Sequence, residues 1–430
     1  MKKTVAFVLS LLLCLSAMPV FAAEDALPVN DMKGEVTFSF WGTPEEVEIQ
    51  EKITAEFNKY YPNIKVNLDH VSGAGDFNTA ILTRMSGGNA PDVFYLGEIS
   101  VEIFRDKGLL CDMLPFAQRD NLDLGDYWDG VLSPAGYNEG HMWAFPKDCT
   151  PYMIYYNKDH FDELGLEYPS ADWTFEDFTE TAKKLTVTAD NGKTTRYGYW
   201  AEHGWCAWFA AAYKNGGAIM NEDCTRLVAD PKTAEALQWY FDLANVHNVS
   251  PAPEAQTSMG GSATDAFMSG LTSMMIGGRF ATYWLKDWDG NYDYTLFPFG
   301  EGVYQPLQFV ALGIPEASKN KDAAWEFIKF YCGKTGQEIN SASGMGLSVM
   351  KSVHESGVWL QEWETENNRE MLTAQFNNTK DLPFHPDWAK LIDDVFYRNL
   401  MEAAGGLKSA AEALDLAVAE GNAYLENNGK

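Results

Sequence analysis

The chain has 430 residues, of which 46% are hydrophobic and 22% charged, a composition typical of a folded globular protein and not of a disordered one. Its 61 acidic residues outnumber its 32 lysines and arginines, so the formal net charge is −29. This acidity argues against nucleic acid or an anionic membrane surface as a partner, because phosphate groups are bound by clustered Lys and Arg. At about 150 residues per domain, the length indicates two or three domains.

Residues 1–23 have the pattern of a secretory signal peptide. Lys2 and Lys3 supply a positive start, and the apolar run 5–18 is shorter than the roughly 20 residues that span a bilayer. Small residues at the end of the segment predict cleavage near Ala22 or Ala23. We therefore expect an exported protein, located in the periplasm or at the cell surface.

The cysteines leave two alternatives open. A lipoprotein signal acylated at Cys14 would need a small residue before it, and Leu13 stands there, so we expect no lipid. In an oxidising compartment Cys206 and Cys224 could form a disulfide, although packed free thiols explain them equally well. No Cys-x-x-Cys pair occurs that would indicate a zinc or redox site.

Strands and helices alternate after the signal. The period-two run 36–41 predicts a strand. A helix follows with Thr43 as its N-cap, Pro44 at its first position and Glu46 closing a capping box. The next predicted elements are a strand at 64–68, a helix at 78–85 and a strand at 93–96. This order predicts a parallel sheet with helices on both faces, whose ligand lies beyond the carboxyl ends of the strands.

The remainder of the chain continues the α/β pattern. A strand is predicted at 152–156, and Thr174 with Asp177 predicts a capped helix start. Further helices are predicted near 233–245, 321–331, 387–403 and 409–425. Since no low-complexity linker occurs, the lobes must be joined by ordinary crossover segments.

Sequence motifs for catalysis and cofactor binding are mostly missing. Residues 73–75 (GAG) lack the third glycine of a dinucleotide fingerprint, and 333–335 (GKT) lack the first glycine of a phosphate loop. No nucleophile elbow or His-Glu-x-x-His occurs, and the seven histidines are dispersed. We therefore expect no cofactor, no metal and no enzyme, with a glycosidase-like carboxylate pair as the alternative left open.

Aromatic residues supply the positive signal. The chain contains 14 tryptophans, and most of them are expected in the core, including Trp239 and Trp325 within amphipathic helices. Several aromatics, however, lie beside glycines or at predicted loop edges: Trp41, Trp205, Trp208 and Phe280. Aromatic faces stack on the C–H face of a sugar ring, while acids and amides bind its hydroxyls.

A series of short motifs resembles the family 1 extracellular solute-binding proteins of bacterial ABC importers, of which maltose-binding protein is the familiar member. The motifs follow the family's order from residue 36 to the C-terminus, which makes the resemblance specific. They are 57–66 (FNKYYPNIKV), 88–93 (GNAPDV), 107–110 (KGLL), 143–148 (WAFPKD), 155–159 (YYNKD), 173–178 (WTFEDF), 276–278 (IGG) and 318–325 (SKNKDAAW).

The resemblance implies an α/β fold: a two-lobe clamshell with mixed, mostly parallel sheets flanked by helices. It implies crossovers between the lobes near 148–152, 308–312 and 346–350. Lobe one would comprise 24–148 with 310–346, and lobe two 149–309 with 347–430.

The resemblance also implies that ligand contacts lie between the lobes. Carried over by position, these are Trp41, Thr43, Glu98, Asp148, Thr150, Trp205, Trp208, Gly278, Arg279, Phe280 and Trp388. Phe280 stands where many members have tryptophan, which leaves the size of the ligand open. A salt bridge to the opposite lobe is the alternative role for Arg279.

The expected function is that of a monomeric transport receptor that binds a sugar or oligosaccharide and delivers it to a membrane permease. Two alternatives are an exported polysaccharide-active hydrolase or lyase and a receptor for a non-sugar polar solute.

Overall fold

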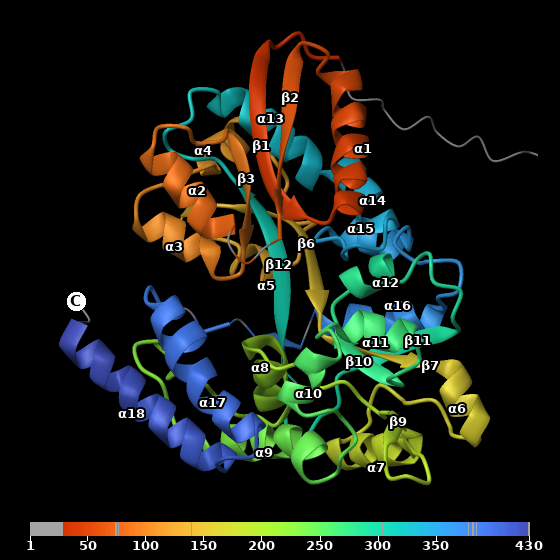
Figure 1. Ribbon diagram of the computed structural model, residues 1–430. Helices are drawn as coiled ribbons and strands as arrows, with labels where there is room; N and C mark the ends of the chain where they lie inside the picture. The colour runs from red at the N-terminus through yellow and green to blue at the C-terminus, as the bar shows by residue number, and fades with distance from the viewer. Residues whose placement is uncertain are drawn as a thin grey trace, which may run out of the picture.

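The computed structural model describes residues 29–73, 75, 77–138, 140–302, 304–376, 378–380, 382–383 and 385–428. The predicted signal peptide, 1–23, therefore lies outside the described residues. Figure 1 shows two lobes, one above the other, with strands running between them. Within the described part of the chain, no helix combines the length and apolarity needed to cross a bilayer.

The upper lobe contains a mixed sheet in the order β13-β12-β3-β1-β2, with β6 (Phe145–Pro151) paired to β12 (Gln305–Gly313). The predicted strands are confirmed as β1 (Gly34–Gly42), β2 (Ile64–Ser72) and β3 (Val93–Gly97), and both β2 and β3 pair parallel with β1. β12 runs antiparallel to both β3 and β6.

Period-two alternation along β1, which lies between β2 and β3, turns one of its faces toward the core. Val36, Phe38 and Phe40 are fully buried, and the Phe38 ring lies 5.3 Å from that of Phe327 in α13 (Lys321–Cys332). On the same side, α1 (Pro44–Tyr60) packs Phe57 against Phe327. The predicted helix at 78–85 is confirmed as α2 (Phe77–Ser86).

The lower lobe is built around a second sheet and a group of helices. Its three strands, β10 (Met274–Gly277), β7 (Met153–Asn157) and β11 (Tyr292–Leu296), are all antiparallel, so a mostly parallel arrangement is wrong for this sheet. The helices are α8 (Trp205–Lys214), α9 (Pro231–Asn245), α17 (Tyr397–Ala404) and α18 (Ala410–Asn428) (Figure 1). A π-helix, η1 (Ala389–Phe396), precedes α17 where a single helix was predicted.

Two of the three predicted N-terminal helix caps are present in the structure, and the third is only partly formed. The capping box of α7 (Phe175–Leu185) is confirmed, since Thr174 Oγ1 accepts from the Asp177 N–H at 3.1 Å. Ser409 and Glu412 form the corresponding bonds at α18. At α1 the Thr43 side chain makes no capping bond, so that half of the predicted capping box is wrong.

The three predicted crossover segments lie side by side. Phe309 of β12 is paired with Cys149 of β6, and Cys149 exchanges hydrogen bonds with Leu347 at 3.1 and 2.9 Å. β6 and β12 run from the upper lobe to the lower one in Figure 1. The exact lobe boundaries stay a prediction, because the larger core cluster includes Tyr155 and Tyr294 together with the first sheet.

The remaining elements are short and connect or cover the two sheets. No disulfide joins the described cysteines, Cys206 and Cys224 included. The bounds are α3 (Ser100–Asp106), α4 (Leu114–Arg119), α5 (Asp129–Leu132), β4 (Tyr137–Asn138), β5 (His141–Met142), α6 (Lys158–Leu164), β8 (Val187–Thr188), β9 (Thr194–Arg196), α10 (Pro253–Ser258), α11 (Ala263–Met268), α12 (Phe280–Trp284), α14 (Lys334–Ala342), α15 (Lys351–Ser356), α16 (Glu366–Gln375) and β13 (Thr379–Lys380).

Candidate ligand-binding site

A pocket of about 590 Å³ lies beyond the carboxyl ends of β1, β2 and β3, where the parallel topology predicts a ligand. The crossovers β6 and β12 and the short helix α12 complete its walls. The structure brings six of the predicted contact residues together here: Trp41, Thr43, Glu98, Asp148, Thr150 and Phe280.

Aromatic rings form two walls of this pocket, which we call the cleft pocket. The Trp41 ring is held edge-on by Phe77 and Tyr95, each with its centroid 5.0 Å away. Phe280 and Trp284 face it from α12, with centroids 4.7 Å apart, and Trp284 is 43% exposed. Sequence reasoning missed Trp284, although its spacing of four residues from Phe280 places both on one helical face.

Glu46 is a second residue that sequence reasoning missed. Its spacing in the sequence predicts only a helix cap, yet it lines the cleft pocket and its Oε1 accepts a hydrogen bond from Trp284 Nε1 at 3.2 Å. Burial raises the pKa of this carboxyl group, against the opposing effect of the Trp284 hydrogen bond. The bond joins α1 of the upper lobe to α12 across the pocket.

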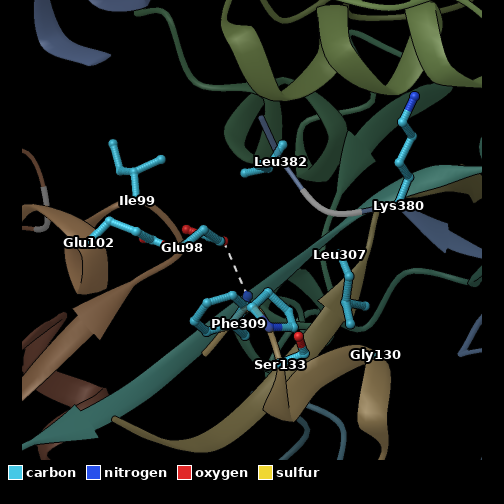
Figure 2. Close-up of a pocket in the computed structure, with 10 residues that line it drawn as sticks. Glu98, Ile99, Glu102, Gly130, Ser133, Leu307, Phe309, Lys380 and Leu382 are labelled. Atoms are coloured by element: carbon cyan, nitrogen blue, oxygen red, sulfur yellow. Dashed lines mark hydrogen bonds between the residues drawn. The ribbon is translucent and has the colours of Figure 1, made fainter. Parts of the chain in front are cut away.

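Glu98 lies at the end of β3, and its Oε1 accepts a hydrogen bond from the Phe309 backbone N–H at 3.2 Å. Burial raises the pKa of Glu98 to about 7. Figure 2 shows this pair beside a smaller cavity of about 150 Å³, so Glu98 and Phe309 form the wall between two cavities. The Lys380 amine points away from Glu98 in this view and lies 4.8 Å from the centre of the Tyr213 ring.

Asp148 is held in place by the residues around the first crossover. Its Oδ2 accepts from Lys147 Nζ and from Asn340 Nδ2, the latter at 3.2 Å. Lys147 is buried by this ion pair and by the Tyr95 ring, whose centre is 5.0 Å away. Among the described residues that line the cleft pocket, three are carboxylates and none is Lys or Arg.

Arg279 does not reach the cleft pocket, and the prediction that it contacts ligand is wrong. Its side chain is fully buried, Nη1 and Nη2 bind the two oxygens of Glu364, and Nη2 also donates to the Trp359 carbonyl at 2.8 Å. Arg279 does form a salt bridge, but its partner Glu364 falls within the same predicted lobe, so the alternative of a bridge to the opposite lobe is not what the structure shows. The partners of Nη1 and Nη2 are therefore protein groups, while the buried Nε has no hydrogen-bond partner among the described residues.

Gly278 does not line the cleft pocket, and its role is to allow close packing of the backbone. A Cβ at this position would lie 2.5 Å from the Phe280 ring and 2.9 Å from Thr150 Cγ2. Only glycine therefore lets β6 and the start of α12 approach so closely. Thr150 Oγ1 accepts a hydrogen bond from the Arg279 N–H, which fixes this approach.

The prediction that Trp208 and Trp388 line the cleft is wrong as well. Both are fully buried in the core of the lower lobe. Trp208 stacks on Tyr397 at 5.6 Å, and Trp388 packs edge-on against Phe209 at 5.9 Å. Each indole fills core volume that a ligand would have to displace.

Trp205 lies in a different pocket, of about 440 Å³, at the start of α8. Glu202 and His203 line it too, and sequence reasoning missed both. Desolvation by the surrounding protein raises the pKa of Glu202 to about 7, although this residue is exposed, and it lowers the pKa of the half-buried His203 to about 4. Neither ring nitrogen of His203 has a hydrogen-bond partner among the described residues. Within those residues, no cluster of three or more His, Cys, Asp or Glu is placed to hold a metal ion.

The two pockets are neighbours. Gln308 lines the cleft pocket and Cys206 the pocket of Trp205, and Gln308 Nε2 lies 3.6 Å from Cys206 Sγ.

The model of the bacterial extracellular solute-binding protein family matches residues 42–338. The chain belongs to this family. The erythritol/L-threitol-binding protein of Mycolicibacterium smegmatis is 27% identical over 397 residues, covering 81% of this chain and 79% of the relative. The family and the two-lobe fold predicted from the motifs are thereby confirmed.

Solved structures of other solute-binding proteins share the fold. An ABC substrate-binding protein from Listeria monocytogenes, in complex with cycloalternan, superposes with a TM-score of 0.83 at 25% identity, covering 92% of this solute-binding protein and 100% of that chain. Maltose-bound MalE3 of T. maritima gives 0.77 at 22% identity, covering 91% and 100%.

Proposed function

We propose that this solute-binding protein is the receptor of an ABC importer and binds a neutral sugar or oligosaccharide reversibly between its lobes. The observation that carries the proposal is the cleft pocket, which combines aromatic walls with three carboxylates and contains no cationic side chain among its described lining residues.

The chemistry of these walls suits a polyhydroxylated ligand. Trp41, Phe280 and Trp284 offer flat apolar faces to the C–H groups of a sugar ring. Carboxylates accept hydrogen bonds from hydroxyl groups, and a charged acceptor makes the stronger kind of bond. An anionic ligand would find no Lys or Arg among the described lining residues to pair with, because the nearby Lys147 is already paired with Asp148.

The neighbouring pocket of Trp205 supports an oligosaccharide over a single ring. It offers an indole face together with Glu202 and His203, whose ring nitrogens are otherwise unsatisfied. Unsatisfied buried polar atoms cost free energy until a partner arrives, so a hydroxyl group of the ligand would be bound favourably. Two neighbouring pockets of about 590 and 440 Å³ offer more room than one ring fills. The erythritol/L-threitol-binding relative and the diacetylchitobiose-binding protein DasA of Streptomyces coelicolor, which is 24% identical over 328 residues, support a polyhydroxylated ligand, and only the second of them supports more than one sugar ring.

Transport requires that binding change the shape of the receptor. A ligand that touches both lobes favours the closed form, and the free energy of closure comes from those contacts. The three adjacent segments at 148–152, 308–312 and 346–350 are the proposed hinge. A partner permease would then distinguish the liganded from the empty receptor, and export to the periplasm or cell surface places the receptor beside it.

A polysaccharide-active hydrolase remains the second candidate, because the raised pKa of Glu98 would suit a general acid. One experiment separates the two. Calorimetric titration of the mature protein with mono- and oligosaccharides should give saturable binding for at least one sugar, and chromatography after prolonged incubation should recover that sugar intact. Cleavage products would favour the enzyme, and no binding by any neutral sugar would refute the proposed ligand class.

A further inference from the structure

A further aromatic pocket, of about 350 Å³, lies on the other side of α12 from the cleft pocket and shares no lining residue with it. We call it the outer groove. Thr282 of α12 and Leu285, the residue directly after it, line the outer groove, whereas Phe280 and Trp284 line the cleft pocket. The loop at 286–291, the start of β11 and residues 361–363 form its other walls.

Three aromatic rings follow one another along this groove. Trp288 stacks on Tyr292 with centroids 5.8 Å apart and planes 29° apart, and Tyr292 lies 4.8 Å from Trp363, which is 37% exposed. Phe267 supports Trp288 edge-on at 5.3 Å. The Trp288 ring also covers Gly290, where a Cβ would lie 2.1 Å from Cζ2, so this ring position requires glycine.

The buried Arg279–Glu364 pair makes the groove rigid. Glu364 Oε2 accepts from Arg279 Nη2 at 2.7 Å and from the Gln361 N–H at 2.6 Å, so the turn that carries Trp363 is tied to the residue preceding α12. A binding site whose walls are held before the ligand arrives loses less entropy on binding. Arg279 therefore positions the turn that carries Trp363, and with it one wall of the outer groove.

We propose that the outer groove is a second saccharide-binding site, independent of the cleft pocket. Asp289, Gln361 and Glu362 line it beside the aromatic rings, which is the combination that binds sugar hydroxyls and C–H faces. Lys286 is the only cation among the described lining residues, it lies over the Tyr283 ring at 3.9 Å, and Asp289 and Glu362 outnumber it, so an anionic ligand is disfavoured. The volume suits one or two sugar rings at the small end of ligand pockets.

The shape and polarity of the outer groove fit a small ligand better than a protein partner. The groove is concave and carries carboxylate and amide groups between its aromatic rings. A docking surface for a protein partner would instead present a broad apolar patch depleted of charge at its centre.

The test uses saturation-transfer NMR on the mature protein with glucose, mannose, N-acetylglucosamine, maltose and mannobiose. The variant Trp41→Ala/Glu98→Gln disables the cleft pocket, and at least one sugar should still receive saturation from it. Adding Trp363→Ala should weaken this residual binding by about tenfold, equivalent to roughly 1.4 kcal/mol. Trp363→Phe should preserve it.

Tyr168→Ala is the matched control, because Tyr168 is an aromatic of similar exposure, 42%, that lies outside both pockets. Gly290→Ala should act like Trp363→Ala by displacing Trp288, while the unfolding midpoint reports whether each variant folds. No transfer from the cleft-disabled variant to any of the sugars would overturn the proposal, as would equal transfer with and without Trp363. Failure of the proposed function would be a different result: the intact protein would bind no sugar with the affinity and stoichiometry of a single site in the cleft.

Discussion

The buried pair Arg279–Glu364 allows a quantitative test of whether Arg279 supports the fold or binds ligand. Both side chains are fully inaccessible to solvent. Replacing Arg279 with Met leaves the Glu364 carboxylate buried with the Tyr294 hydroxyl and the Gln361 N–H as its remaining partners. An uncompensated buried charge of this kind costs about 3–5 kcal/mol.

The double variant Arg279→Met/Glu364→Gln removes both charges together. It should cost less than Arg279→Met alone, because a buried ion pair is often replaced by neutral groups at little cost. Urea denaturation of the wild type, both single variants and the double variant completes a double-mutant cycle, with a coupling free energy of roughly 1–3 kcal/mol between contacting residues. The reasoning is refuted if Arg279→Met unfolds at the wild-type midpoint. It is also refuted if that variant is as stable as the wild type but loses sugar binding at the cleft pocket, which would make Arg279 a ligand contact.

Four further outcomes are expected. Trp41→Ala should weaken sugar binding by about 1–3 kcal/mol in calorimetry with little change in unfolding midpoint, whereas Trp388→Ala, in the core, should lower the free energy of unfolding by about 3–5 kcal/mol with little change in affinity. The pKa of Glu98, raised to about 7 in the folded state, means that the folded protein binds this proton more tightly. Its contribution to stability is therefore present below the unfolded value of about 4.3 and is lost as the pH rises through about 7; Glu98→Gln should flatten that part of the urea-midpoint profile. Intact mass of the exported protein should give an N-terminus near Ala23 and no lipid on Cys14; a chain beginning at an acylated Cys14 would contradict the cleavage prediction. Small-angle scattering should show a smaller radius of gyration when a binding sugar is added, and an unchanged radius at saturation would count against lobe closure.

Features that depend on neighbouring residues could be predicted from the sequence. The strand at 36–41, the helix after it and the capping box at Thr174 follow from period-two alternation and from bonds between residues three apart. The position of the cleft pocket also followed, because Trp41 and Glu98 stand at the ends of parallel strands of one sheet and must meet at the same edge.

Burial was decided by the tertiary structure. Trp208 and Trp388 look no different from Trp41 in sequence, yet η1 and α8 bring them together in a core while Trp41 faces a pocket. The partner of Arg279 lies 85 residues away along the chain, at a distance where no local pattern indicates a contact.

Tertiary packing also explains why Glu46, Glu202 and His203 could not be identified from the sequence. Glu46 has the spacing of a helix cap, and only the position of α12 turns it toward Trp284. Glu202 and His203 belong to no motif, and their shifted pKa values arise from desolvation by the surrounding protein. Local hydrogen bonding and periodicity thus determine the elements from sequence alone, whereas which side chains face a ligand depends on the packing of distant segments, which desolvates some groups and leaves others open.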